Sequence, residues 1–144
     1  MKTIFFAIGL TLMGIGRAWA ADDDATEGIP PLPDDAVVET TATGLQFYDF
    51  VLGAGELPDP TGSVRVAYTG YLPDGTIFDS SDSVVFNLGG LIAGFSEGVT
   101  GMQVGGRRRL IIPPDLGYGA SGNAGAGIGG EDTIIFDVEL LSIE

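Results

Sequence analysis

The sequence predicts an α+β domain in which an antiparallel sheet of five or six strands has its buried face covered by one short helix. Three observations support this fold class. Several runs alternate between apolar and polar residues with the period of a strand. Only one segment has the spacing of an amphipathic helix. Glycine accounts for 24 of the 144 residues, an abundance that favours a loop-rich β protein over a helical one.

The expected strands all follow residue 41. The clearest alternation places Val64 and Val66 on one face, and the longest run places Phe136 and Val138 on one face. The sequence Pro-Asp-Gly at residues 73–75 is a turn signal between two of the strands. The strand-like runs lie at residues 44–52, 63–68, 76–79, 84–86, 107–112 and 133–141.

The single expected helix lies within residues 90–102. Ile92, Phe95 and Val99 follow one another at helical spacing, with polar residues between them. Gly98 and Gly101 suit the end of a helix. The segment is therefore predicted to cover the apolar face of the sheet.

The first 20 residues have the pattern of a secretory signal peptide. Lys2 gives a positive start, residues 4–15 are almost entirely apolar, and Ala18-Trp19-Ala20 matches a small-x-small cleavage site. The alternative is an uncleaved membrane anchor. The apolar run is shorter than the roughly 20 residues needed to span a bilayer, so the signal peptide is favoured and stable membrane insertion is not expected.

Residues 21–40 are expected to form an acidic, disordered linker. Seven of these residues are acidic and three are proline, a composition that extends a chain and prevents a packed core. A partner-binding tail is the alternative. The folded domain is then expected to occupy residues 41–144.

Charge and residue inventory exclude several classes of function. The chain has 20 acidic and 6 basic residues, a net charge of −14. Without residues 1–20, which include Lys2 and Arg17, 20 acids would face four arginines, a net charge of −16. Nucleic acid and anionic lipid should repel such a chain. The absence of cysteine and histidine excludes disulfides, zinc–imidazole sites and Ser-His-Asp triads.

Two other motifs are discounted. Arg107-Arg108-Arg109 lies in an expected strand, where neighbouring side chains point to opposite faces, so a polyanion patch is disfavoured. The spacing Gly125-x-Gly127-x-x-Gly130 lacks the strand-then-helix context of a dinucleotide site.

Four sequence blocks, in order, resemble those of FKBP-type peptidyl-prolyl cis/trans isomerases. The family patterns are VxYTGxLxDGxxFDSS, GWxEGV, VGGxRxLxIPPxLGYG and TLxFxVELL. The matching blocks lie at residues 66–81, 94–99, 104–119 and 133–141. The resemblance covers most of residues 41–144. It implies a half-barrel of antiparallel strands wrapped around one short helix, and an isomerase that acts on X-Pro bonds of exported proteins during folding, without metal or cofactor.

The resemblance also implies a set of site residues. Asp79 beside the rotating bond, the Tyr118 hydroxyl and the Ile92 amide are the implied catalytic groups. The implied substrate-binding residues form an apolar pocket whose floor is Phe95. They are Tyr68, Phe78, Val84, Leu91, Phe95, Ile128 and Phe136.

Each of these residues also has a structural interpretation. Phe78, Phe95 and Phe136 could be core aromatics, Asp79 could form a turn, and Tyr118, like Tyr68, could make structural hydrogen bonds. The recurrence of all of them at the family's positions favours the functional interpretation.

The chain departs from the family pattern in three places. The segment between Ser81 and Phe86 is short, Phe95 replaces a tryptophan, and residues 123–130 lack the usual Ile-Pro-Pro rim. These departures motivate an alternative, a binding or chaperone module without turnover; a structural envelope protein is a third reading. The expected partners are proline-containing polypeptides, with a macrolide as candidate inhibitor. The expected state is an exported monomer. The periplasm is the simplest destination, with secretion beyond the cell and an organelle lumen as alternatives.

Overall fold

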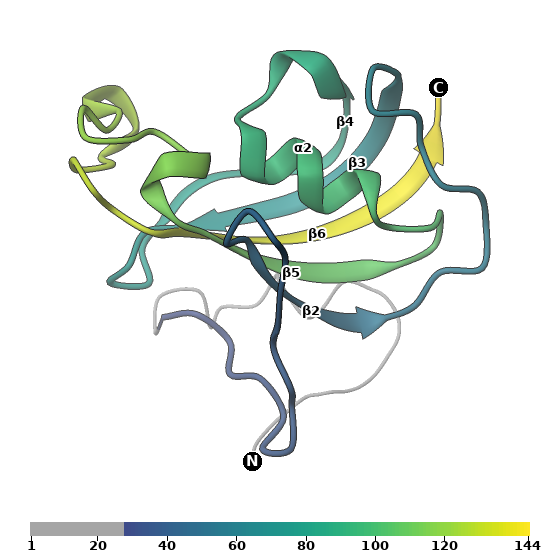
Figure 1. The fold of residues 1–144 in the computed structure, drawn as a ribbon, viewed down its shortest axis with the longest axis horizontal. Coiled ribbons are helices and arrows are strands. Elements are labelled where there is room, and N and C mark those ends of the chain that lie inside the picture. Colours follow the sequence, from purple (N-terminus) through teal and green to yellow (C-terminus); the bar gives the residue numbers. More distant parts are fainter. Residues whose placement is uncertain (1–27) are drawn as a thin grey trace.

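A computed structural model describes residues 28–144 (Figure 1). The predicted signal peptide and residues 21–27 of the predicted linker lie outside this part. All strand pairs are antiparallel, in the order β1-β2-β5-β6-β3-β4. The strands are β1 (Glu39–Thr40), β2 (Gln46–Val51), β3 (Ser63–Tyr71), β4 (Ile77–Asn87), β5 (Arg107–Ile112) and β6 (Ile134–Ile143).

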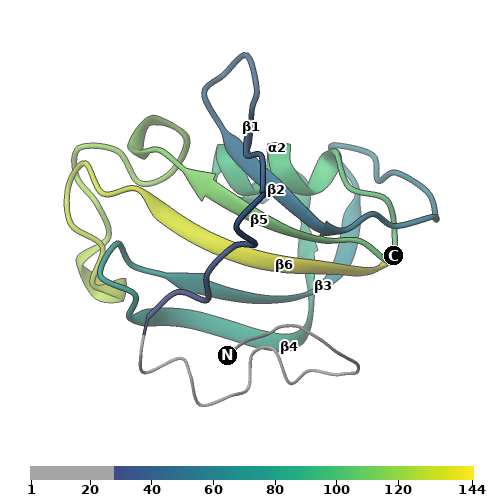
Figure 2. The same ribbon diagram turned by 90° about the horizontal axis from the view of Figure 1, so that it is seen from below.

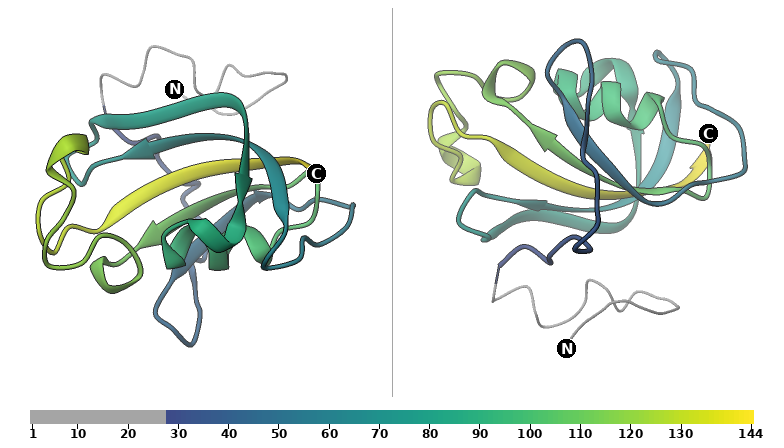
Figure 3. Two further views of the ribbon diagram at one scale, coloured as in Figure 1. Left: turned by 90° about the horizontal axis from the view of Figure 1, so that it is seen from above. Right: turned by 60° about the horizontal axis from the view of Figure 1, so that its bottom comes forward.

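One α-helix, α2 (Ala93–Thr100), is present in the described residues, together with three short 3-10 helices. These are η2 (Leu88–Gly90), η3 (Pro114–Leu116) and η4 (Ala124–Ala126). The sheet curves around α2, which lies against its concave, inner face (Figure 3). The predicted fold class is therefore confirmed.

Strand β4 differs from the expectation because the two short runs at residues 76–79 and 84–86 form one strand. The strand is continuous, but it contains two extra residues, one at each of two bulges. Phe78 is the extra residue where Gly70 pairs with Asp79 and the next pair joins Tyr71 to Ile77. A second bulge lies at residues 82–83. Bulges bend a strand and increase its twist, and β4 accordingly bends from the sheet toward α2 (Figure 3).

The core lies between α2 and the inner face of the sheet. The helix approaches β5 closely because Gly94 and Gly98 carry no side chain. A Cβ at Gly94 would lie 2.6 Å from Cγ2 of Ile112, and one at Gly98 would overlap the side chain of Leu110. The buried apolar residues are Leu45, Val64, Val66, Tyr68, Leu88, Phe95, Val99, Met102, Leu110, Ile112, Ile128, Ile134, Phe136, Val138 and Leu140.

Arg108 joins the carboxyl end of α2 to the sheet. Its Nη1 donates to the carbonyl of Gly98 at 3.0 Å, one of the helix-end carbonyls that lack an intrahelical partner. Its Nε and Nη2 donate to the carboxylate of Asp49 at 2.7 and 3.1 Å. The guanidinium also lies 4.1 Å from the centre of the Phe47 ring. The middle arginine of the predicted strand thus fixes the helix position.

The amino-terminal residues of the described chain lie on the other, outer face of the sheet (Figure 2). The amide of Ala36 donates to the carbonyl of Pro33 at 3.0 Å, forming a turn. Glu39 and Thr40 then pair with Phe47 and Gln46 as β1. The sheet therefore begins two residues before the predicted domain start.

Candidate active site

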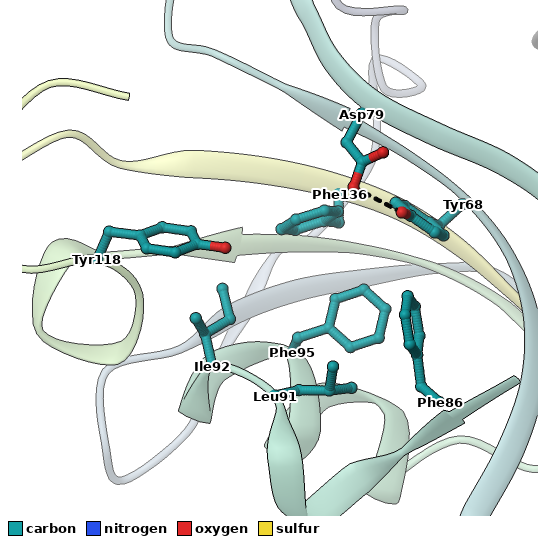
Figure 4. A pocket seen from close by; sticks show the side chains of 8 residues that line it. All are labelled: Tyr68, Asp79, Phe86, Leu91, Ile92, Phe95, Tyr118 and Phe136. Atoms are coloured by element: carbon teal, nitrogen blue, oxygen red, sulfur yellow. Dashed lines mark hydrogen bonds between the residues drawn. The ribbon is translucent and has the colours of Figure 1, made fainter. Parts of the chain in front are cut away.

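A pocket of about 200 Å³ opens between the inner face of the sheet and the start of α2. Figure 4 shows the side chains that surround it. Most are apolar, and three carry an oxygen. The lining residues are Tyr68, Asp79, Phe86, Leu91, Ile92, Phe95, Tyr118 and Phe136.

Phe95 lies at the centre of an aromatic cluster. It is only 4% exposed, and its ring contacts those of Tyr68, Phe86 and Phe136 with centroid distances of 6.1, 6.0 and 5.1 Å. All three contacts are close to perpendicular, the edge-to-face arrangement that aromatic rings favour. The close seat of α2 on β5 places this ring at the bottom of the pocket.

Tyr68 and Asp79 join neighbouring strands across the pocket wall. The Tyr68 hydroxyl donates to Oδ2 of Asp79 at 2.6 Å, a short bond to a charged acceptor. Burial, together with this bond and the charge of Asp79, raises the pKa of the Tyr68 phenol above its usual range. The phenol therefore stays protonated as a donor, and Asp79 stays oriented toward the cavity (Figure 4).

Tyr118 and Ile92 bring two donors to the opposite side. Tyr118 follows η3, and the amide of Gly119 donates to the carbonyl of Pro114 at 2.8 Å, which fixes the turn. Its hydroxyl points across the cavity (Figure 4), and no partner for it is found within residues 28–144. Ile92 precedes the first residue of α2, and in the same part of the chain its amide has no backbone acceptor. Both donors are available to a bound carbonyl.

Seven of the ten predicted site residues thus line one cavity. They are Tyr68, Asp79, Leu91, Ile92, Phe95, Tyr118 and Phe136. The other three predicted residues, Phe78, Val84 and Ile128, lie outside the lining.

Each of these three has a different position. Phe78, the bulged residue of β4, packs edge-on behind Phe136 at 5.5 Å. Val84 pairs with Val66 and packs on the core. Ile128 is 3% exposed, because the loop folds back and the Ile128 amide donates to the carbonyl of Asn123 at 3.0 Å. It supports the loop from beneath and does not form an open rim.

Phe86 lines the pocket and was missing from the predicted set. It lies two residues beyond Val84, on the same side of β4, and its ring contacts Tyr68 at 5.7 Å. The bend at the second bulge brings this position over Phe95. The available signal was its aromatic side chain, on the face that strand alternation assigns to Val84.

Other kinds of site are not indicated by the described residues. Residues 28–144 contain no group of three acidic side chains placed to hold a metal ion. No helix in that range is long and apolar enough to cross a bilayer.

Comparison with known proteins connects this site to a family. Residues 54–141 match the model of the FKBP-type peptidyl-prolyl cis-trans isomerase domain. The chain is 44% identical over 126 residues to the FKBP-type 22 kDa peptidyl-prolyl cis-trans isomerase of Escherichia coli, covering 83% of this chain and 61% of that protein. It is 40% identical over 111 residues to FkpA of the same organism, covering 74% and 40%. The chain thus spans less than two thirds of the length of these relatives.

Solved structures agree with this assignment. A peptidyl-prolyl cis-trans isomerase from Pseudomonas syringae has a TM-score of 0.71 and 36% identity, with 74% of this chain and 80% of that chain covered. The crystal structure of FkpA from Escherichia coli also has a TM-score of 0.71, with 40% identity and coverages of 74% and 51%. Together with the matching pocket, these likenesses show that the chain belongs to the FKBP-type peptidyl-prolyl cis-trans isomerase family.

Proposed function

We propose that the chain is an active peptidyl-prolyl cis/trans isomerase whose groove is the pocket around Phe95. The observation that carries this proposal is the Tyr68–Asp79 hydrogen bond on the wall of an otherwise aromatic and aliphatic cavity. Catalysis of rotation about an X-Pro bond needs such a combination of an apolar floor and a few fixed polar groups, for the energetic reasons that follow.

The barrier to rotation of a peptide bond is about 18–20 kcal/mol, because the amide has partial double-bond character. The twisted transition state loses this resonance and much of the amide dipole. Transfer from water into an apolar pocket therefore costs the planar ground state more than the twisted state. Donors that meet the carbonyl only in the twisted geometry lower the barrier further. No covalent intermediate or metal is required.

The lining residues divide between these two tasks. The proline ring would rest on Phe95, between Tyr68 and Phe136, where the rings exclude water. The Ile92 amide and the Tyr118 hydroxyl, both without partners among residues 28–144, would donate to substrate carbonyls. Asp79, held by Tyr68, would lie beside the twisting bond and act through its charge.

The direct test is cis-to-trans exchange of an Ala-Leu-Pro-Phe peptide. We expect acceleration over buffer at micromolar protein. Asp79→Ala and Tyr118→Phe should each lower kcat/KM by at least tenfold with the unfolding midpoint nearly unchanged. Asp115→Ala and Tyr48→Phe are matched controls, because both side chains lie outside the pocket lining. Full activity in both pocket variants would contradict the assigned roles.

A proline-peptide binding or chaperone module without turnover is the second candidate. It is favoured by Phe95, which fills less of the floor than the tryptophan usual in the family. This candidate predicts saturable binding of the same peptide in a fluorescence titration, with no rate enhancement. Binding that is lost in Phe95→Ala, together with absent catalysis, would establish it in place of the isomerase.

The proposed setting is outside the cytoplasm, with unfolded, proline-containing polypeptides as substrates and a monomeric chain. The signal-like pattern of residues 1–20 supports export. Mass spectrometry of the protein from its cells should give a chain that begins at Ala21. A chain that retains Met1 or Lys2 would contradict cleavage. A macrolide that occupies the groove should inhibit the isomerase activity in the same exchange assay.

A further inference from the structure

Several residues on the outer face of the sheet are buried although α2 lies on the inner face. Tyr71 is 2% exposed, Asp137 1% and Arg109 5%. In β3, β6 and β5, respectively, these side chains alternate with inner residues such as Gly70, Phe136 and Leu110, so they point away from the helix. Tyr71 is also absent from the core cluster beneath α2. The ring of Phe50 covers part of Arg109, with its centre 5.4 Å from the guanidinium carbon. We expect a second layer that covers the rest of this face.

The buried pair Arg109–Asp137 makes that cover energetically important. Nε and Nη2 of Arg109 donate to the two carboxylate oxygens of Asp137 at 2.6 and 2.8 Å. Burial by itself would lower the pKa of Arg109, but the charge and hydrogen bonds of Asp137 raise it overall. Burial and the charge of Asp137 raise the pKa of Tyr71. A charge pair kept from water depends on whatever excludes the water.

Residues 28–38, here called the strap, lie where this cover is needed. At one end, Gly28 touches Gly75: a Cβ placed on Gly75 would lie 2.6 Å from the Gly28 Cα. At the other end the strap continues into β1, where Thr40 pairs with Gln46. Figure 2 and the right panel of Figure 3 show the strap crossing the strands between these points.

The strand register identifies what lies beneath the strap. Tyr71 pairs with Ile135, Ile135 with Ile111, and Ile111 with Gln46. These four residues form one row across the outer face, from the strand beside Gly75 to the strand that pairs with β1. The neighbouring row contains Arg109 and Asp137. The strap therefore runs along a row of three apolar residues that ends at the exposed Gln46 and borders the ion pair.

The side chains of the strap are consistent with docking on this row. Ile29, Leu32, Ala36 and Val38 are half-buried, whereas Val37 is 76% exposed. The acidic residues of the strap, at positions 34 and 35, are exposed and stay solvated. The strap thus has an apolar side toward the sheet and a charged side toward water.

We propose that the outer face of the sheet is a docking surface for the strap, and that this contact stabilises the domain by excluding water from the Arg109–Asp137 pair. The folding unit then begins near residue 28, well before the first family block. The proposal concerns stability and does not depend on isomerase activity.

Two matched pairs in the full chain test the contact. Val38→Ser removes a half-buried strap side chain, and Val37→Ser makes the same change at its exposed neighbour. Leu32→Ser and Leu57→Ser form a second pair, since Leu57 is 60% exposed. We expect Val38→Ser and Leu32→Ser to lower Tm by about 5 °C each, and the two controls to leave Tm within about 1 °C. Equal effects within both pairs would overturn the proposal.

The coupling to the ion pair is tested in a second background. Residues 29–38 are replaced by a Gly-Ser sequence of equal length in the full chain, and Asp137→Asn is made with and without this change. With the strap intact, Asp137→Asn should lower Tm by 10 °C or more; with the Gly-Ser strap its further effect should be less than half as large, because water then solvates Arg109. If the Gly-Ser chain does not fold, the same comparison is made in Leu32→Ser. An effect of Asp137→Asn that is equal in both backgrounds would contradict shielding by the strap.

Discussion

The inner and outer faces of β3 and β6 differ in kind although their residues alternate along the same two strands. Tyr68 and Phe136 face an open, largely apolar pocket in which one carboxylate and two phenols are the polar groups. Thr69 and Asp137, their immediate neighbours in the chain, lie on the outer face, where Asp137 forms a buried ion pair with Arg109. The inner face leaves hydrogen-bond donors free in the pocket, whereas the outer face pairs Arg109 with Asp137.

This difference separates function from stability within a few residues. In the proposed isomerase, groups that act on a substrate must keep hydrogen-bonding capacity free, as the Tyr118 hydroxyl does among residues 28–144. Groups that hold the fold must be fully paired, because an uncompensated buried charge is costly. Variants of the inner face should therefore lower activity with little change in the free energy of unfolding, and variants of the outer face should do the reverse.

The largest expected effect is on the outer face. Asp137→Asn leaves Arg109 buried without its counter-charge and should lower the free energy of unfolding by about 3–5 kcal/mol. In urea denaturation the midpoint should fall, while kcat/KM at low temperature stays unchanged because the pocket is on the other face. Glu144→Gln is the control: it breaks the exposed Arg65–Glu144 pair and should not move the midpoint. Loss of activity without loss of stability in Asp137→Asn would refute this separation.

A change at the helix should lower activity and stability together. Gly98→Ala places a methyl group against the side chain of Leu110 and forces α2 away from β5. Overpacking of this kind costs about 1–3 kcal/mol, partly offset by the better helix propensity of alanine. Since α2 carries Phe95, kcat/KM should fall together with the denaturation midpoint. Gly125→Ala is the control, because its Cβ would meet only the Asn123 side chain, at an ordinary contact distance of 3.5 Å. Unchanged activity in Gly98→Ala would show that the floor tolerates a shift.

Alkaline pH should affect both faces through their tyrosines. Burial raises the folded-state pKa of Tyr68 and Tyr71 above the unfolded value, which is about 10. The folded state then keeps protons that the unfolded state has lost. Stability from these groups is complete below about pH 10, and above it falls by about 1.4 kcal/mol per pH unit for each phenol. Denaturation midpoints between pH 8 and 11 measure this slope. Tyr71→Phe should reduce it, whereas an unchanged slope would exclude Tyr71 as a contributor.

The smallest effect concerns substrate charge at the inner face. Asp79 lines the pocket and no lysine or arginine does so. A peptide with Lys before proline should gain about 1 kcal/mol over one with Leu, the energy of two charges about 4 Å apart in water, or roughly fivefold in kcat/KM, and a peptide with Glu should lose about as much. This preference should shrink in 0.5 M salt, while a Leu-Pro peptide is unaffected. A Lys-to-Glu ratio that is independent of salt would argue against direct electrostatic selection.

Much of the fold and most of the pocket were predictable because they depend on local patterns. Alternation in β3 and β6 placed their inner faces, and helical spacing placed Phe95. The family blocks then brought Asp79 and Tyr118 to the same site as Tyr68. Each of these predictions depends on periodicity or motif, which sequence carries directly.

The missed features depend on geometry that periodicity does not encode. Val84 was assigned to the pocket in place of Phe86 because a bulge and the resulting bend of β4 cannot be counted from alternation. Ile128 was expected at an open rim, but backbone hydrogen bonds with Asn123 turn it inward. The strap has a composition typical of a linker, and its contact with the outer face depends on a surface formed by distant strands.

The bulges of β4 have a consequence beyond the pocket. The strand forms one border of the sheet, and within residues 28–144 no strand pairs with its outer side. Long free borders of this kind invite strand addition by other polypeptides. Irregular backbone at Phe78 and at residues 82–83 interrupts the row of free amides and carbonyls, and Asp79 and Asp82 add charges that repel an equally acidic copy. In the proposed isomerase, the border strand is thus protected against backbone pairing with unfolded substrates.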